Sequence, residues 1–418
     1  MNGNKTAKGR RVLMLVENLS FPWDRRMRHL ANALRRAGYS VSVICPKGEG
    51  QDRAAFEVID GVKVYRYPTR YAASAIGYLW EYPWAFFCTA VLSLLVWIRD
   101  GIDIIHSANP PDFFFLLALP FKLLGKKYVF DEHDVSPELY EAKFQRRDLP
   151  YRLLLLLQKA SYRTADLVLS TNESYRDIAR ERGRLSAAKL AVVRNGVDLE
   201  YFSRKEPRPE LKEGFAYLAV YLGVMGSQDG VDSVIRAAHH LVHTHGRKDV
   251  LTVLIGKGEC WAGLQQLTRE LQLESFVKFT GRIPDALLLD YLSTADVCLA
   301  PDPPSAMNQM STMIKILEYM ACKCPIVSFD LLESRRSAAE AAHYVEHNDP
   351  GMFATAIHDL LNDPARRKRM GQVGLDRSTH LIGWSRSRES LLEAYSRLEE
   401  THPRQRQEET LADTVEVR

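Results

Sequence analysis

The stretch "STMIKILEYMACKCPIVSF", residues 311–329, decides the fold because it joins a helix to a buried strand. Apolar residues recur at helical spacing through its first half: Met313, Ile314, Leu317 and Met320. The last five residues, "PIVSF", form the short apolar run of a buried parallel strand. The mostly apolar helix nevertheless keeps one carboxylate, Glu318, and we expect it to begin near two hydroxyl residues, Ser311 and Thr312.

The same alternation of strand and helix extends through the whole chain. In the first half, strand-like runs stand at residues 11–16, 39–46, 103–108, 127–134, 166–171 and 189–196. In the second half they stand at residues 216–223, 250–256, 277–281, 295–301 and 325–329. The first helix is predicted after Asp24 as N-cap and before Gly38 as terminator. Strands that alternate with helices predict doubly wound parallel sheets.

The two sets of strands predict two Rossmann-like domains, at residues 1–200 and 201–383. The segment near 197–215, rich in charge and proline, is the predicted linker. Residues 384–401 are predicted to form an amphipathic helix that packs back toward the N-terminal domain. Residues 402–418 are polar, have no hydrophobic period, and are predicted to be disordered.

Composition and charge indicate a soluble globular protein with a basic N-terminal half. Of the 418 residues, 46% are hydrophobic and 26% are charged. Residues 1–200 contain 30 Lys and Arg against 22 Asp and Glu, whereas residues 201–418 contain 26 against 30. This asymmetry suggests either an anionic partner on the N-terminal side or a solvated charged surface. The six cysteines have no zinc-ligand spacing and are interpreted as reduced thiols of a cytosolic protein.

The most hydrophobic run is "WAFFCTAVLSLLVWI", residues 84–98. Fifteen residues are fewer than the ~20 that span a bilayer, so a buried helix and an interfacial membrane helix both stay open. The N-terminal "MNGNKTAKGRR" has no apolar core and does not resemble a secretory signal.

Ligands of open α/β sheets bind beyond the carboxyl ends of the strands, so residues that follow strands are the candidates. The helix predicted to begin at Ser311 offers backbone N–H groups to an anion, and Lys315 adds a charge. Glu318 can accept hydrogen bonds from a ribose diol. The alternative is that Ser311 is only an N-cap and that Glu318 is a paired surface residue.

The segment "KILEYMACKCPIV" resembles the donor-site helix of retaining glycosyltransferases of family 4, which have the GT-B fold of two Rossmann-like domains facing a central cleft. The likeness covers about residues 11–400 and includes "NGVD", "GVDSVIRAA", "LIGKGE", "FTGRIP" and "LSTADVCLAP". It implies that Glu318 holds the nucleotide ribose, and that Ser311, Thr312 and Met313 belong to the donor site. The S-T-M-x-K helix start is similar to that of a bacterial polysaccharide-biosynthesis branch.

The chain departs from the family pattern at three positions. Where the family has a sugar-contacting glutamate, an arginine and a lysine, this sequence has Met310, Val224 and Asp229. Two lost cations weaken phosphate binding unless they are replaced, since charge-assisted hydrogen bonds are the strong ones. The predicted replacements lie at strand ends: Lys257, Arg282 and Lys315 for the phosphates, and Asn308 for the sugar.

In the N-terminal half, "FDEHDVSPELYEAKF", residues 130–144, places polar residues directly after a strand. His133 resembles the family histidine that faces the donor sugar, and its predicted role is to hydrogen-bond a hydroxyl and stabilise charge. Asp134 and Glu138 are candidates for the acceptor side, and Glu138 is alternatively a helix cap.

Two further segments are predicted to line the acceptor side. In "ENLSFPWDRRMRHLA", residues 17–31, the family's glycine-rich loop is missing, and Arg25 or Arg26 is a candidate phosphate ligand or part of a solvated basic face. Asp24 is an N-cap, an acceptor contact, or both. In "HSANPPD", residues 106–112, Asn109 and Asp112 follow another strand.

Phosphate-loop, dinucleotide and nucleophile-elbow motifs are missing, which argues against ATPases, dehydrogenases and hydrolases. With no D-x-D suited to a metal, we expect metal-independent sugar transfer. The predicted donor is a UDP- or GDP-linked sugar, and the predicted acceptor is a glycan or polyprenyl-linked saccharide at the inner face of the membrane. No nucleic-acid partner is expected. The alternatives are a catalytically silent scaffold of a polysaccharide assembly complex, or an epimerase or phosphorylase on the same fold.

Overall fold

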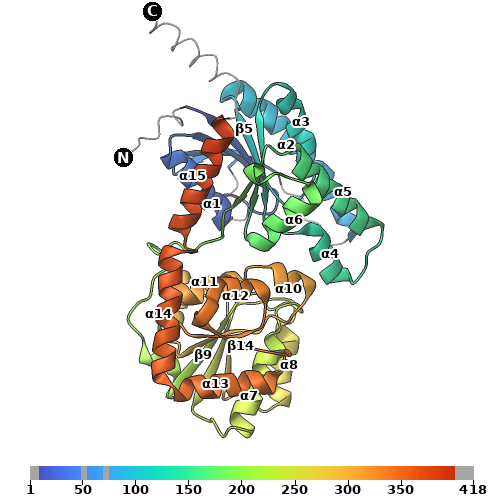
Figure 1. The fold of residues 1–418 in the computed structure, drawn as a ribbon. Coiled ribbons are helices and arrows are strands. Elements are labelled where there is room, and N and C mark those ends of the chain that lie inside the picture. Colours follow the sequence, from blue (N-terminus) through green and yellow to red (C-terminus); the bar gives the residue numbers. More distant parts are fainter. Residues whose placement is uncertain (1–8, 49–53, 69–74, 401–418) are drawn as a thin grey trace, which may run out of the picture. The chain divides into compact units, whose positions relative to one another are not determined.

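The computed structural model describes residues 9–48, 54–68 and 75–400, and the tail predicted to be disordered lies outside these residues. The chain divides into two compact units, which Figure 1 shows as ribbons. Unit 1 comprises the described residues up to Val193 together with those from Arg388 onward, and unit 2 comprises Arg194–Ser387. The division falls a few residues before the predicted boundary at 200.

Unit 1 contains, among its described residues, an eight-stranded sheet of order β3-β4-β2-β1-β5-β6-β7-β8. All neighbouring strands are parallel except β3 and β4, which form an antiparallel hairpin at one edge. The strands are β1 (Arg11–Leu15), β2 (Ser40–Pro46), β3 (Phe56–Ile59), β4 (Val62–Tyr67), β5 (Ile104–Ala108), β6 (Lys127–Glu132), β7 (Leu167–Ser170) and β8 (Leu190–Val192).

The helices of unit 1 connect these strands. They are α1 (Arg25–Arg36), α2 (Ala75–Arg99), α3 (Phe115–Leu123), α4 (Ser136–Phe144), α5 (Leu149–Thr164) and α6 (Glu173–Gly183), with the short η1 (Ala187–Lys189) before β8. Asp24 caps α1 as predicted, because its carboxylate accepts a hydrogen bond from the Met27 N–H. The C-terminal helix α15 (Trp384–Glu400) returns to this unit: the Tyr395 hydroxyl lies 2.6 Å from His106 Nδ1, and the Tyr39 hydroxyl donates to Glu399.

Unit 2 is built on a six-stranded, fully parallel sheet of order β11-β10-β9-β12-β13-β14. The strands are β9 (Tyr217–Leu222), β10 (Val250–Ile255), β11 (Val277–Gly281), β12 (Val297–Ala300), β13 (Ile326–Phe329) and β14 (Ala342–Val345). The helices are α7 (Val231–His243), α8 (Trp261–Glu270), α9 (Asp285–Thr294), α10 (Ala306–Met310), α11 (Ile314–Ala321), α12 (Leu332–Ala338), α13 (Pro350–Asn362) and α14 (Pro364–His380), with the short η2 (Pro209–Lys212) and η3 (Ala339–Ala341).

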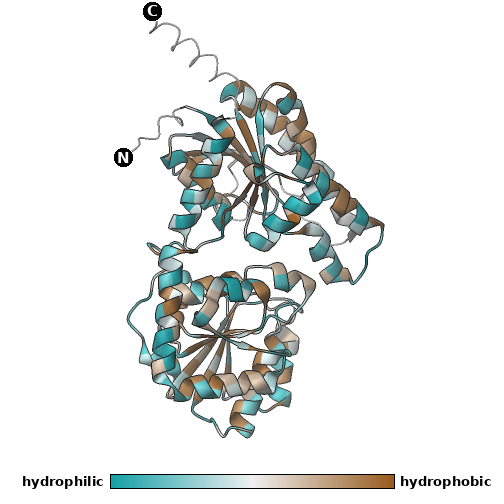
Figure 2. Cartoon of the chain, in the orientation of Figure 1, coloured by the Kyte–Doolittle hydropathy of each residue, from teal (hydrophilic) through white to brown (hydrophobic). Residues whose placement is uncertain are grey.

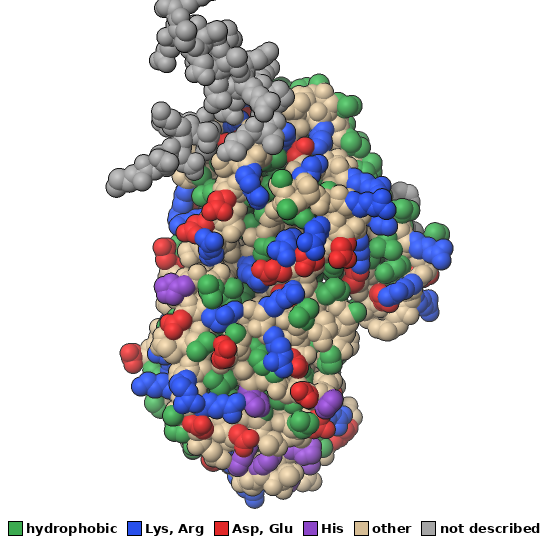
Figure 3. Space-filling model, in the orientation of Figure 1, with side chains coloured by type: hydrophobic (Ala, Val, Ile, Leu, Met, Phe, Trp, Pro, Cys, Tyr) green, Lys and Arg blue, Asp and Glu red, His purple; other side chains and the backbone are tan. Residues whose placement is uncertain are grey.

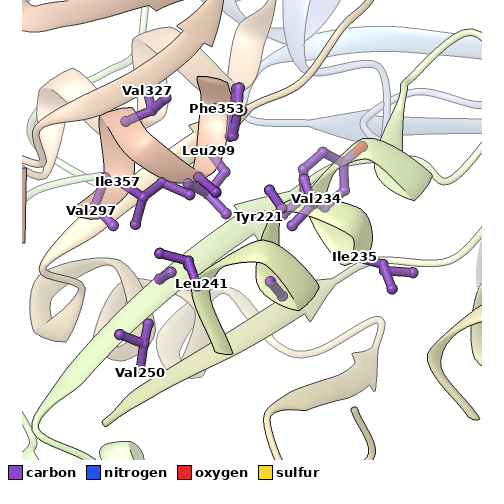
Figure 4. Packing of buried hydrophobic residues seen from close by; sticks show 14 of the residues in the cluster. Tyr221, Val234, Ile235, Leu241, Val250, Val297, Leu299, Val327, Phe353 and Ile357 are labelled. Atoms are coloured by element: carbon purple, nitrogen blue, oxygen red, sulfur yellow. The ribbon is translucent and has the colours of Figure 1, made fainter. Parts of the chain in front are cut away.

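Helices cover both faces of the unit 2 sheet, and the strand pattern explains why. Successive side chains of a strand point to opposite faces. Leu254 packs with α7 and α13 in one core cluster, whereas Val253 packs with α9 and α11 in the other. Figure 4 shows the first cluster, in which Tyr221 from β9 lies with Leu299 from β12 and with Phe353 and Ile357 from α13. Because both faces are buried, the central strands β9, β10, β12 and β13 are mostly apolar.

In the stretch 311–329, the helix begins later than the sequence predicts. Residues 306–310 form the separate short helix α10, Ser311 is its C-cap in an extended conformation, and α11 begins only at Ile314. The Ser311 hydroxyl donates to the Met307 carbonyl, so it terminates one helix instead of capping the next. The expected helix start at Ser311 is therefore wrong by three residues, and Glu318 lies one turn into α11 instead of two.

None of the six cysteines forms a disulfide, in agreement with the predicted thiols. The apolar run 84–98 lies within α2, and only one face of this helix is buried. The described segment Glu81–Arg99 is long and apolar enough to cross a membrane by length and composition, yet only 22% of its apolar window is buried.

Candidate functional site

The strand order of unit 2 defines where a ligand would bind. After β9 the chain adds β10 and β11 on one side, and then β12 begins on the other side of β9. A crevice forms at such a reversal, beyond the carboxyl ends of the strands. Two connections therefore border the candidate donor site: residues 223–230, after β9, and residues 301–313, after β12.

Glycines hold the connections of this edge close together. A Cβ on Gly256 would lie 1.8 Å from the Gly223 carbonyl oxygen, so the ends of β9 and β10 approach at backbone distance. Gly230, the N-cap of α7, has a φ of 66°, and a Cβ there would lie 2.1 Å from the Pro301 carbonyl oxygen. Only glycine allows the start of α7 to lie against the connection after β12.

Lys315 points from the first turn of α11 into this edge. Its ammonium donates to Asp302 Oδ1 at 2.7 Å, and it lies 4.9 Å from the ring centroid of Tyr221. Both side chains of this ion pair are nearly fully buried. The Lys315 ammonium, predicted as a phosphate ligand, is thus already paired with a carboxylate, and an arriving diphosphate would compete with Asp302 for it.

Acidic groups also lie at this edge. Asp229, which stands where the family has a lysine, accepts a hydrogen bond from the Gly226 N–H at 2.9 Å. Burial raises the pKa of Asp229, Lys315 opposes that rise, and Asp302 and Glu259 add to it.

The other predicted donor residues lie on the same edge. The Asn308 amide donates to the carbonyls of Gln228 and Pro303, so it ties the two bordering connections together. These two bonds use the N–H₂ group of Asn308, and its predicted contact with the sugar stays a prediction. Glu318 is buried on the first full turn of α11. Thr312 and Met313 follow Ser311 in the extended connection.

Lys257 and Arg282 differ from Lys315 because both are exposed. Lys257 follows β10 and lies over the Trp261 ring at 5.8 Å, and Arg282 follows β11. Both stay candidates for phosphate ligands on long, mobile side chains.

The strand ends of unit 1 carry a second polar cluster, centred on Asp131 at the end of β6. Its fully buried carboxylate accepts from Arg26 Nε and Nη2 at 3.0 and 2.6 Å and from His133 Nε2 at 2.8 Å. His106 Nε2 lies 3.4 Å away. Burial alone would raise the pKa of Asp131, but Arg26 and the two histidines outweigh it and hold that pKa well below its usual range.

This cluster orients His133. A carboxylate only accepts, so His133 Nε2 carries the proton of the bond to Asp131 and Nδ1 is left as the second ring nitrogen. The backbone N–H of His133 donates to Asn109 Oδ1 at 2.6 Å, and its side chain is 17% exposed. His133 is therefore held at both its ring and its backbone while it keeps an edge toward solvent.

Three predicted acceptor-side residues have other roles. Arg26 is buried, binds Asp131, and donates to the Val193 carbonyl at 2.6 Å, so it does not serve as a phosphate ligand. The Asn109 N–H₂ group donates hydrogen bonds to Asp112 Oδ1 and to the Asp134 carbonyl. Glu138 pairs with Arg182 of α6, and its predicted cap and acceptor roles are replaced by this ion pair. Each correction has the same physical reason, since a buried polar group is satisfied within the fold.

The other candidates of unit 1 stay near the surface. Arg25 is exposed on the first turn of α1, next to its N-cap Asp24. Asp134 is partly buried, and burial raises its pKa. The sequence interpretation missed Asp302, His106 and Tyr395 as members of the two clusters. Asp302 follows β12 directly, so its strand-end position was a signal, whereas Tyr395 comes from a helix more than 260 residues along the chain from β6.

Comparison with known proteins agrees with this architecture. Residues 24–196 match the family model "Glycosyl transferase 4-like domain", and residues 216–363 match "Glycosyl transferases group 1". The fold is GT-B, and the two matched domains cover most of the chain. The chain belongs to the glycosyltransferases, with a 4-like domain followed by a group 1 domain.

Individual relatives are distant. D-inositol 3-phosphate glycosyltransferase of Thermomonospora curvata is 27% identical over 257 residues, which are 56% of this chain and 57% of that relative. The alignment thus spans a little over half the length of that relative. Sucrose-phosphate synthase from Thermosynechococcus elongatus has a TM-score of 0.71 at 18% identity, over 93% of this chain and 99% of that chain. Anabaena HepE in complex with UDP and glucose has a TM-score of 0.70 at 15% identity, with the same coverage of both chains.

Proposed function

We propose that this protein transfers a sugar from a nucleotide-diphosphate donor to a glycan or lipid-linked saccharide, with retention of the anomeric configuration, in cell-surface polysaccharide biosynthesis. The observation that carries the proposal is the edge of unit 2 at the reversal of strand order, where Lys315, Glu318 and the first turn of α11 lie together. The UDP and glucose named for Anabaena HepE support a nucleotide-sugar donor.

On the donor side, the departing diphosphate carries the charge that has to be stabilised. The start of α11 offers backbone N–H groups, and Lys315 offers an ammonium held in place by Asp302. Lys257 and Arg282 supply further cations from neighbouring strand ends. Glu318 accepts hydrogen bonds from the ribose hydroxyls. Ser311, Thr312 and Met313 border the phosphates and the sugar.

On the sugar and acceptor side, His133 hydrogen-bonds a hydroxyl of the transferred sugar. Because Asp131 accepts the Nε2 proton, Nδ1 of a neutral His133 accepts the bond from the sugar. A protonated His133 would instead donate from both nitrogens and stabilise negative charge on the leaving group. Asp24 and Arg25 at the start of α1, together with Asp134 after β6, are the proposed contacts to the acceptor. The proposed location is cytoplasmic, at the inner face of the membrane.

A second acceptor class has support from the relatives. The Thermomonospora curvata relative is named for transfer to D-inositol 3-phosphate, a small phosphorylated polyol. An acceptor of that class would need a cation in unit 1, and exposed Arg25 is the candidate because Arg26 is paired with Asp131. The alternative to an enzyme is a catalytically silent scaffold. It is motivated by Met310, Val224 and Asp229, which stand where the family has a glutamate, an arginine and a lysine.

Nucleotide binding tests the proposal. A thermal-shift titration of the full chain with UDP, GDP and ADP should raise the melting temperature for one of them, and Glu318→Ala should lower that affinity about tenfold or more through lost ribose hydrogen bonds. Glu270→Ala, a change on α8, is the matched control and should leave the affinity unchanged. A chain that binds none of the three nucleotides at millimolar concentration would be a scaffold.

Incubation with the matching radiolabelled nucleotide sugar then separates the acceptor classes. Transfer that requires the lipid fraction of a membrane extract supports a lipid-linked acceptor, and transfer to inositol phosphate supports the small phosphorylated polyol. The anomeric configuration of the product tests retention.

A further inference from the structure

In helix α2, polar side chains face the protein interior and large apolar side chains face outward, the reverse of a helix on a water-exposed surface. Its inward face is made of small, polar or short residues, all fully buried: Ala85, Thr89, Ser93 and Val96. Its outward face is made of large apolar residues: Phe87, Val91, Leu94, Leu95 and Ile98. Phe87 is 62% exposed and Ile98 is 80% exposed, whereas Ser93 is 0% exposed. Burying hydroxyls while large apolar side chains face outward is the reverse of the expected amphipathic pattern.

Two neighbouring helices repeat this arrangement. On α3, the exposed face carries Leu116, Leu119 and Leu123, followed by the exposed C-cap Leu124, and Leu123 is 89% exposed. On α5, the exposed residues Leu149, Leu153 and Leu156 recur at helical spacing, while Gln158 and Ser161 are buried. We call the outward residues of α2, α3 and α5 together the apolar face. Single exposed apolar residues are common, but a run over three helices marks an interaction surface.

The three helices form one continuous surface of unit 1. The rings of Trp97 on α2 and Phe121 on α3 are 5.7 Å apart, and those of Phe86 and Phe113 are also 5.7 Å apart. Helix α3 in turn packs against α5. Figure 1 shows α2, α3 and α5 side by side in this unit, and Figure 2 shows hydrophobic stretches on them.

The charges around the apolar face have one sign. Between residues 81 and 164, six basic side chains are exposed: Arg99, Lys143, Arg146, Arg147, Arg152 and Arg163. The acidic side chains of the same segment are buried or partly buried, with Asp148 as the one exposed acid. Figure 3 shows hydrophobic and basic side chains intermingled along the margin of this unit where α3 and α5 lie. Apolar side chains bordered by cations complement a surface of acyl chains and anionic headgroups.

The inward face of α2 shows that this helix lies on a surface instead of crossing it. Ala85 and Val96 belong to the same core cluster as Leu13 and Ile44 of the sheet. A helix that left this position to span a bilayer would expose that core and would place the buried Thr89 and Ser93 hydroxyls in hydrocarbon.

We propose that the apolar face of α2, α3 and α5 docks onto an anionic lipid bilayer, with the outward leucines, Phe87 and Ile98 in the headgroup–acyl boundary and the six basic side chains on the lipid phosphates. This deepens the proposed function, since it names the surface and the partner by which unit 1 reaches a membrane-held acceptor. It does not require donor binding, so the two can fail separately.

Co-sedimentation of the full chain with vesicles tests the docking. The wild type should bind vesicles of phosphatidylcholine with phosphatidylglycerol, and Leu94→Gln/Ile98→Gln/Leu123→Gln should lower that partition about tenfold or more. The matched control is Met352→Gln/Leu381→Gln, which changes exposed apolar residues of unit 2 and should keep wild-type binding. Arg146→Ser/Arg152→Ser should weaken binding to the anionic vesicles and its dependence on salt, whereas Arg269→Ser on α8 should not.

Three results would overturn the proposal. The triple variant could bind anionic vesicles as tightly as the control. The wild type could fail to bind the vesicles of phosphatidylcholine with phosphatidylglycerol. Sedimentation velocity could show that the wild type is a dimer that does not bind vesicles and that the triple variant is a monomer. That result would assign the apolar face to contact with a second copy of the chain. The nucleotide thermal shift of each variant reports on folding, and its retention together with lost vesicle binding separates docking from donor recognition.

Discussion

At the proposed donor site of unit 2, Asp302 and the diphosphate of a bound nucleotide would compete for the Lys315 ammonium. Asp302 fixes the ammonium with a 2.7 Å hydrogen bond, yet its charge also opposes the diphosphate. Asp302→Asn keeps an acceptor for Lys315 and removes the charge, so we expect nucleotide affinity to rise about fivefold. Lys315→Met should lower it about tenfold or more, because a charge-assisted bond is lost.

Isothermal titration with the nucleotide that gives the largest thermal shift measures both effects. Lys368→Met, an exposed lysine on α14, is the control and should bind as the wild type does. If Asp302→Asn instead weakened binding, Asp302 would contact the ligand directly and the competition would not exist.

Arg26 and Asp131 form a buried ion pair of unit 1, with side chains 6% and 0% exposed. Arg26→Met leaves the Asp131 charge without its main partner, so we expect a loss of about 3–5 kcal/mol of stability. The double variant Arg26→Met/Asp131→Asn should recover much of that loss because no unpaired charge remains. Hydrogen exchange of the β5 and β6 amides reports the stability of this sheet.

Arg25→Met, one position earlier on α1 and exposed, should change the same exchange rates by no more than about 0.5 kcal/mol. Strictly additive effects of Arg26→Met and Asp131→Asn would show that the two side chains do not stabilise each other.

The end of β6 holds a second buried acid, Glu132, which connects this strand to helix α5. Gln158 and Tyr162 of α5 both donate to its Oε1 atom, while Oε2 has no hydrogen-bond partner in the structure. Burial raises the pKa of Glu132 to about 8, Asp112 adds to the rise, and the α5 hydrogen bonds oppose it. The folded state therefore keeps a proton that the unfolded chain releases near its ordinary value of 4.5.

The sign of the effect follows directly. The folded state binds more protons between about pH 4.5 and 8, so Glu132 stabilises the fold below that window and its contribution is lost as the pH rises through it. Glu132→Gln should remove on the order of 3 kcal/mol of pH dependence between pH 5 and 8, judged by urea unfolding. Glu181→Gln, an exposed acid on α6, should keep the wild-type slope. An unchanged slope in Glu132→Gln would place the proton on another group.

The helices and strands were predictable to different degrees. The buried strands β1, β5, β9, β10 and β13 coincide with apolar runs, because full burial on both faces requires them. The hairpin β3–β4 and the edge strand β14 were missed, since these short strands mix apolar and polar residues. The start of α11 was misplaced because hydroxyl residues are typical both of helix N-caps and of the extended turn that ends α10.

Partners within the site could not be predicted from the sequence. Strand ends located Lys315, Glu318 and His133 because parallel strands bring their carboxyl ends to one edge. Their roles depend on groups that are distant in sequence: Arg26 meets Asp131 over 105 residues, and His106 meets Tyr395 over 289. Spacing along the chain carries no signal for such pairs.

The chain folds as two units with separate cores. A ligand that binds one unit is therefore expected to stabilise that unit and not the other. The proposed nucleotide contacts come from one unit, Arg194–Ser387. A ligand stabilises the part of a protein that binds it, by an amount set by its concentration relative to Kd. We therefore expect the nucleotide alone to slow hydrogen exchange in residues 223–230 and in α11 of unit 2, while the β5 and β6 amides of unit 1 keep their exchange rates.

Hydrogen exchange of the full chain, read by mass spectrometry with and without the nucleotide at about 100 times its Kd, measures this, and the expected stabilisation of the binding elements is about 2.7 kcal/mol. The Glu318→Ala variant at the same nucleotide concentration should show less protection at both unit 2 segments, because its Kd is higher. Protection that extended equally into β5 and β6 would mean that the nucleotide also contacts unit 1. Protection confined to unit 1 would contradict the proposal, because the donor would then bind at the sheet of unit 1.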